Sequence, residues 1–119
     1  LTNSPKRRAM HRLILMRHAK AERDAASGRD RDRPLSARGR DDAALIARVL
    51  KDKGLRPDLA LVSNAARTRQ TWEGMEDVFG DVEVRLEPHL YNADARELRS
   101  FVEANEEAAG CLILVAHNP

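Results

Sequence analysis

The sequence predicts a three-layer α/β/α domain, in which helices cover both faces of a mostly parallel central sheet. Three uninterrupted apolar runs, at 13–16, 59–62 and 112–116, indicate buried strands. Segments with apolar residues at helical spacing separate these runs. Alternating strands and helices are typical of this fold class.

The strands differ in the burial that their patterns predict. The first apolar run, Leu13–Met16, has no polar residue, and the same holds for 59–62 and 112–116. We therefore expect each of these three strands to be covered on both faces of the sheet. A fourth and weaker candidate, Val82–Leu86, alternates apolar and polar residues and suits an edge position.

Helical patterns fill the intervals between the strands. Ser36 can cap a first helix, which is expected to stop near Gly54. A second helix is expected over Ala66–Phe79, because a glycine follows directly. A third helix begins with a capping-box pattern, in which Glu97 follows Asp94 by three positions.

The length of 119 residues allows one domain. We expect this domain to occupy 10–119, after a flexible extension over 1–9. The chain stops at Pro119, shortly after the last apolar run, so we expect a C-terminal part of the domain to be missing from this sequence. The charged stretch Glu22–Arg33 has no apolar periodicity and is expected to be a surface loop that could close over a site.

Composition excludes several classes of protein. The single cysteine, Cys111, excludes an intrachain disulfide and a cysteine-based zinc site, and it is expected to be a buried thiol. No apolar run is long enough for a membrane helix, and the basic start resembles no secretory signal, so no membrane partner and a cytoplasmic location are expected. The net charge of +2 gives little reason to expect a nucleic-acid partner, even with the basic segment Lys6–Arg8.

Basic side chains follow the buried strands. Arg17 and His18 come directly after the first, Arg67 follows the second by one helical turn, and His117 follows the third. The carboxyl ends of parallel strands line the ligand crevice of such sheets, so these side chains are expected to converge. Two arginines and two histidines without matching carboxylates favour an anion, and guanidinium groups bind phosphate oxygens well.

Four segments resemble the histidine phosphatase superfamily, in its SixA-type phosphohistidine phosphatase branch. They occur in the family's order and spacing, and they are Leu13–Lys20, Arg33–Gly39, Ser63–Thr71 and Val115–Pro119. The resemblance implies a phosphoglycerate mutase-like fold and a phosphatase that needs no metal and no cofactor.

The resemblance also implies a role for each basic residue. His18 would be the nucleophile and become transiently phosphorylated, Arg17 and Arg67 would bind the phosphoryl oxygens, and His117 would complete the pocket. To attack, His18 must be neutral with one ring nitrogen free, so its other nitrogen should donate to a backbone carbonyl.

This chain departs from the family pattern in three places. Ala19 stands where many members have glycine, and Asn64 stands where many have proline. In the region Glu87–Ala93, where related branches carry a glutamate as general acid, we find no convincing counterpart. Its absence fits a phosphohistidine substrate, because a P–N bond needs less help for its leaving group than a phosphate ester does.

We therefore expect a hydrolase that removes phosphate from phosphohistidine on a protein and releases inorganic phosphate. A phosphomonoesterase for a small phosphorylated metabolite and a weakly active phosphate-binding module are the alternatives. Other polar residues have plainer interpretations. Ser63 is expected to cap a helix or to donate to a neighbour, since no base is placed to activate it. His11 and His89 are expected at the surface, and Trp72 in the core.

Overall fold

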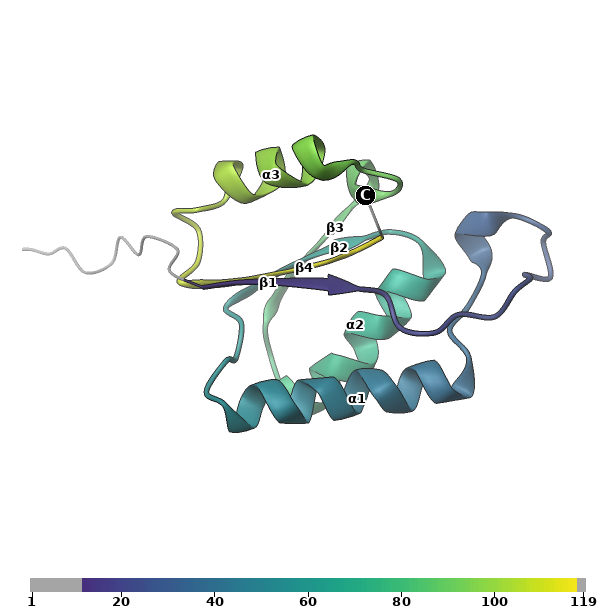
Figure 1. The fold of residues 1–119 in the computed structure, drawn as a ribbon, viewed down its shortest axis with the longest axis horizontal. Helices are drawn as coiled ribbons and strands as arrows, with labels where there is room; N and C mark the ends of the chain where they lie inside the picture. Colours follow the sequence, from purple (N-terminus) through teal and green to yellow (C-terminus); the bar gives the residue numbers. More distant parts are fainter. Residues whose placement is uncertain (1–11, 118–119) are drawn as a thin grey trace, which may run out of the picture.

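Four parallel strands form one sheet, in the order β1-β4-β2-β3 (Figure 1). The computed structural model describes residues 12–117. The strands are β1 (Arg12–Arg17), β2 (Leu59–Ser63), β3 (Glu83–Glu87) and β4 (Cys111–Ala116). The register aligns Leu112 of β4 with Leu13 of β1 on one side and with Leu59 of β2 on the other.

Three α-helices connect the strands and cover both faces of the sheet. They are α1 (Ala37–Asp52), α2 (Ala66–Phe79) and α3 (Ala95–Ala104), and two short 3-10 helices are η1 (Asp30–Asp32) and η2 (Pro88–Leu90). Helices α1 and α2 lie on one face, and α3 lies on the other (Figure 1). The predicted three-layer class is therefore confirmed, and so is the edge position of the fourth strand, which begins and ends one residue later than predicted.

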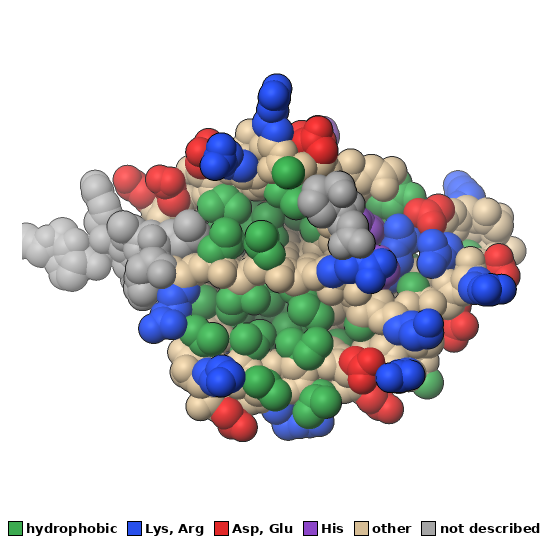
Figure 2. Space-filling model, in the orientation of Figure 1, with side chains coloured by type: hydrophobic (Ala, Val, Ile, Leu, Met, Phe, Trp, Pro, Cys, Tyr) green, Lys and Arg blue, Asp and Glu red, His purple; other side chains and the backbone are tan. Residues whose placement is uncertain are grey.

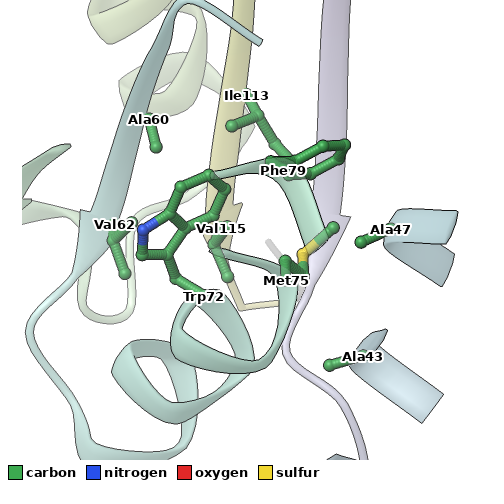
Figure 3. Packing of buried hydrophobic residues seen from close by; sticks show 9 residues of the cluster. All are labelled: Ala43, Ala47, Ala60, Val62, Trp72, Met75, Phe79, Ile113 and Val115. Carbon is green, nitrogen blue, oxygen red and sulfur yellow. The ribbon is translucent and has the colours of Figure 1, made fainter. Parts of the chain in front are cut away.

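Two hydrophobic clusters hold the layers together. Trp72, Met75 and Phe79 of α2 pack against β2, β4 and the small residues Ala43 and Ala47 of α1 (Figure 3). On the opposite face, leucines of β2 and β4 pack against the apolar side of α3. Burial of these apolar side chains is the main force that fixes the strand ends in place.

The predicted helix ends are confirmed. Ser36 Oγ accepts a hydrogen bond from the Gly39 amide at 3.0 Å and caps α1. Gly54, with φ of +76°, follows directly on the C-cap of α1. The capping box of α3 is complete, because Asp94 and Glu97 each accept from the other's backbone amide at 2.9 Å.

The expectation that β1 is covered on both faces is wrong. Leu13 is 40% exposed and Leu15 is 64% exposed, whereas β2 and β4 are buried throughout. β1 is one of the two edge strands, and its two leucines and α3 line a cavity of about 310 Å³. Figure 2 shows apolar side chains on this side of the molecule, both between β1 and α3 and between β1 and α1.

Several expectations fall outside the described residues. These are the extension over 1–9, the placement of His11, the basic segment Lys6–Arg8, and the last two residues of the fourth family segment. None of the helices within 12–117 is both long and apolar enough to cross a bilayer.

Candidate active site

The carboxyl ends of β1, β2 and β4 bring the predicted basic residues to one edge of the sheet. The imidazole rings of His18, after β1, and His117, after β4, lie edge to face with centroids 5.5 Å apart. Arg67 projects from the first turn of α2, which follows β2. Figure 2 shows histidine side chains beside a group of basic side chains at this end of the molecule.

The ring of His18 is oriented by its own backbone neighbour. Its Nδ1 lies 2.7 Å from the carbonyl oxygen of Ala19. A carbonyl oxygen only accepts hydrogen bonds, so the ring nitrogen must be the donor. The proton therefore sits on Nδ1, and Nε2 keeps its lone pair. The pKa of His18 is lowered, mainly by burial. The hydrogen bond to Ala19 raises this pKa, whereas the positive charges of Arg67 and Arg17 lower it.

His117 is oriented by Ser63 at the end of β2. Ser63 Oγ lies 2.9 Å from Nε2 of His117, and it also accepts from the Ala65 amide at 3.5 Å. The other ring nitrogen of His117, Nδ1, is buried without a hydrogen-bond partner in the described part of the chain. The pKa of His117 is lowered to about 4, first by burial and then by the charge of Arg67, so the ring is neutral near pH 7.

The loop that carries His18 is fixed from two helices. The amide of Ala19 donates to Thr71 Oγ1 of α2 at 3.0 Å. One residue further on, the carbonyl of Lys20 accepts from the amide of Ser36 at 2.9 Å and from its hydroxyl at 3.0 Å. A Cβ on Gly39 would lie 2.1 Å from this carbonyl oxygen, so only glycine permits α1 to approach so closely.

The charged loop between β1 and α1 lies against Arg67. Nη1 of Arg67 donates to the backbone carbonyl of Asp30 at 2.8 Å, and Nη2 donates to its carboxylate at 3.0 Å. The Arg67 side chain is only 7% exposed, so this carboxylate is its partner inside the protein. Hydrogen bonds from Tyr91, Arg33 and Arg67 hold the pKa of Asp30 well below its usual range, and the group is therefore a carboxylate that carries no proton to give.

An aromatic side chain lies between Asp30 and His117. Tyr91, directly after η2, stands edge to face against His117 with centroids 5.3 Å apart. Its hydroxyl donates to the carboxylate of Asp30 at 2.5 Å. The guanidinium carbons of Arg31 and Arg67 lie 5.1 and 5.9 Å from its ring centroid, within cation–π distance.

Arg17 stands at the open rim of the site. It is exposed, and with His117 it lines a cavity of about 230 Å³ whose other walls are the apolar residues Leu15, Met16, Leu98, Leu114 and Ala116. Its charge lowers the pKa of both histidines. The site thus has a cationic rim on one side of an apolar recess.

The structure brings together all four residues that the sequence singled out: His18, Arg17, Arg67 and His117. Ser63 also contacts this group, while His89 is exposed on η2, Cys111 is buried and Trp72 packs in the core. Burial raises the pKa of the Cys111 thiol, which suits the expected inert role.

Sequence reasoning did not identify Asp30, Tyr91 or Thr71 as residues of this site. Tyr91 had a usable signal, because it is the one tyrosine of the chain and lies in the region after β3 that faces the same edge of the sheet. Asp30 had none, because it is one of several charged residues in the loop Glu22–Arg33.

The sequence profile of the histidine phosphatase superfamily (branch 1) matches residues 13–110 of this chain. The chain belongs to the histidine phosphatase superfamily. Among solved structures, the SixA protein of Agrobacterium tumefaciens is 38% identical with a TM-score of 0.86, over 92% of this chain and 71% of that one. The protein histidine phosphatase SixA in complex with tungstate is 29% identical with a TM-score of 0.79, over 88% of this chain and 68% of that one. These similarities place the chain in the SixA-type branch of this superfamily.

Two curated relatives are longer than this chain. An uncharacterized chloroplastic protein of Arabidopsis thaliana is 42% identical over 97 residues, which are 79% of this chain and 44% of the relative. A 2,3-bisphosphoglycerate-dependent phosphoglycerate mutase of Chelativorans is 38% identical over 71 residues, which are 57% of this chain and 34% of the relative. The matched parts of this chain thus cover less than half the length of each of these relatives.

Proposed function

We propose that this protein is a phosphatase that works through a phosphohistidine intermediate on His18. The observation that carries the proposal is the 2.7 Å contact of His18 Nδ1 with the Ala19 carbonyl, because it leaves Nε2 unprotonated beside a set of fixed cations. A neutral imidazole nitrogen among arginines is suited to attack a phosphoryl group and to stabilise the charge that spreads over its oxygens.

The proposed reaction has two steps. In the first, Nε2 of His18 forms a bond to phosphorus while the bond from phosphorus to the substrate's leaving atom breaks, and the leaving group takes up a proton from solvent. In the second, the oxygen of a water molecule forms a bond to phosphorus while the bond from phosphorus to Nε2 breaks, which releases inorganic phosphate with the protons of that water and restores the neutral His18. Arg17 and Arg67 bind the phosphoryl oxygens, and His117 completes the pocket. We propose that neither step uses a metal ion.

The proposed substrate is a phosphohistidine on a protein. The carboxylate of Asp30, which is paired with Arg67, supports this substrate class. It holds no proton and therefore cannot act as a general acid for an ester oxygen. A phosphoramidate needs this help less, because imidazole is a much weaker base than an alkoxide and is therefore the better leaving group. The exposed position of Arg17 at the rim also suits a substrate presented on the surface of another protein.

A trapping experiment tests the nucleophile. The intact protein is mixed with a radiolabelled phosphohistidine carrier protein and quenched rapidly, and the enzyme is examined for an acid-labile, base-stable label. We expect label in the wild type with steady release of phosphate, and neither in His18→Ala. His89→Ala serves as the matched control, because His89 is an exposed histidine on η2.

The result also separates the alternatives for substrate and activity. Clearly faster release from simple phosphate esters than from the phosphohistidine carrier would overturn the substrate assignment while leaving the intermediate in place. The enzymatic proposal would be overturned if the wild type showed no label and no release of phosphate while His18→Ala still bound phosphate. We propose the cytoplasm as the compartment, which a tagged protein followed by cell fractionation would test.

A further inference from the structure

The carboxylate of Asp30 is shared by three donors from three parts of the chain. One oxygen, Oδ2, accepts from Nη2 of Arg67 at 3.0 Å and from the hydroxyl of Tyr91 at 2.5 Å. The other oxygen, Oδ1, accepts from Nη1 of Arg33 at 2.7 Å. The donors lie in α2, after η2 and in the segment that leads into α1, so one side chain links three elements around the site.

Arg67 depends on this residue for its orientation. Its side chain is 7% exposed, and each of its two terminal nitrogens is hydrogen-bonded to Asp30, one through the backbone carbonyl and one through the carboxylate. Two bonds to one residue fix both the position and the plane of a guanidinium group. Nε of Arg67 is buried without a partner among the described residues.

Tyr91 extends the same network to the second histidine. Its hydroxyl is held by Asp30, and its ring stands edge to face on His117 at 5.3 Å between centroids. Arg31, the neighbour of Asp30 on η1, lies 5.1 Å from the same ring. The loop with Asp30 therefore packs against the walls of the pocket on the side of Arg67 and His117.

We propose that Asp30 is a positioning residue of the phosphatase site, which aligns Arg67 and Tyr91 for a phosphoryl group without touching it. The inference rests on the function proposed above. The opposite possibility is that the carboxylate occupies the place of phosphate and weakens its binding. The contacts favour positioning, because both carboxylate oxygens are already satisfied by donors of the protein and the backbone carbonyl of Asp30 holds Arg67 independently.

The test compares Asp30→Ala and Asp30→Asn in the intact protein with the wild type. Tungstate affinity is measured by calorimetry, and kcat and KM are measured with a phosphohistidine carrier protein. For Asp30→Ala we expect tungstate affinity and kcat/KM to fall about tenfold to a hundredfold, because a misplaced binding group has effects of this size. Asp30→Asn should recover part of both, since its amide oxygen can still accept from Arg67 and Tyr91.

Three further variants make the test specific. Asp32→Asn is the matched control, because Asp32 lies on the same short helix and its carboxylate is bonded to Ser27 and Arg29, away from Arg67 and Tyr91, so this variant should behave as the wild type. Tyr91→Phe and the double variant with Asp30→Ala form a mutant cycle, in which we expect the two losses to overlap and not to add.

The outcomes separate this inference from the proposed function. Tighter tungstate binding in Asp30→Ala would show that the carboxylate competes with phosphate and would overturn the inference. Unchanged affinity and turnover in a folded Asp30→Ala would overturn it as well. A wild type without turnover contradicts the proposed function, whereas the effect of Asp30 on tungstate affinity is still measured in that case.

Discussion

The amide of Ala19 and the hydroxyl of Thr71 are joined by a 3.0 Å hydrogen bond, although the two residues lie 52 positions apart in the chain. The same hydroxyl donates to the carbonyl of Arg67 at 2.7 Å. One fully buried side chain therefore ties the loop after His18 to the helical turn that carries Arg67.

Replacing Thr71 by valine should destabilise the protein and impair the site. Valine has nearly the same shape, but it leaves the Ala19 amide without its acceptor, which typically lowers the free energy of unfolding by about 1–3 kcal/mol. Urea denaturation and tungstate affinity are the measurements. Thr71→Ser keeps the hydroxyl and should retain tungstate affinity, so an equal loss of affinity in both variants would contradict the role of the hydrogen bond.

Gly39→Ala should be strongly destabilising. The added Cβ would lie 2.1 Å from the backbone oxygen of Lys20, and neither partner is a flexible side chain that can move aside. We expect the free energy of unfolding to fall by about 2–4 kcal/mol, with a loss of activity because Lys20 follows the His18 loop. Gly74→Ala is the control, since its Cβ would meet the Ala43 Cβ at 3.3 Å and should lower the urea midpoint less. Equal midpoints would show that the close approach at Gly39 is easily relieved.

Ser63→Ala should disturb the tautomer of His117. Without the hydroxyl at 2.9 Å, Nε2 of His117 loses its hydrogen-bond partner, and this contact no longer holds the tautomer and the orientation of the ring that we propose to complete the pocket. We expect kcat to fall about tenfold, in the range of an improperly oriented acid–base group. The ¹⁵N shifts of His117 report the tautomer directly, and an unchanged spectrum would refute this role for Ser63.

Stability should decrease on acidification below about pH 6.5. The folded pKa of His117 is lowered from 6.5 to about 4, so between these values the unfolded state binds more protons and becomes favoured as the pH falls. The lowered pKa of Asp30 acts in the same direction, because its contribution is present above its unfolded value of 3.8 and is lost as the pH falls through its folded value. Urea denaturation should therefore give a free energy of unfolding that is lower at about pH 4.5 than at about pH 7, by on the order of 1–2 kcal/mol.

A variant identifies the group responsible for this pH dependence. His117→Gln keeps a polar side chain but removes the titration, so its stability should change less over the same interval. A slope identical to that of the wild type would assign the effect to other groups, such as His18, whose pKa is also lowered by burial.

Local patterns in the sequence were sufficient for most elements. The span of α2 from Ala66 to Phe79 was predicted because the apolar spacing and the following glycine are properties of neighbouring residues. The convergence of His18, Arg67 and His117 was also predictable, since parallel strands align their carboxyl ends at one edge of the sheet. These features depend on chain direction and periodicity alone.

The remaining features depend on which segments pack together. The exposure of Leu15 follows from the strand order, which puts β1 at the edge, and an apolar run carries no information about its neighbours. The pairing of Asp30 with Tyr91 joins residues 61 positions apart, and no local pattern distinguishes Asp30 from the other acidic residues of its loop.

The span of α2 from Arg67 to Thr71 has a consequence for how the site forms during folding. Within these five residues, Arg67 contacts the loop of Asp30, Gln70 accepts from the Leu35 amide at 2.7 Å, and Thr71 holds Ala19. The partners are 35 to 52 positions away in sequence, so no short fragment can contain the pocket, and it should appear only at the last, cooperative stage of folding. An oxyanion that binds only the completed pocket should therefore stabilise the native state and slow global unfolding.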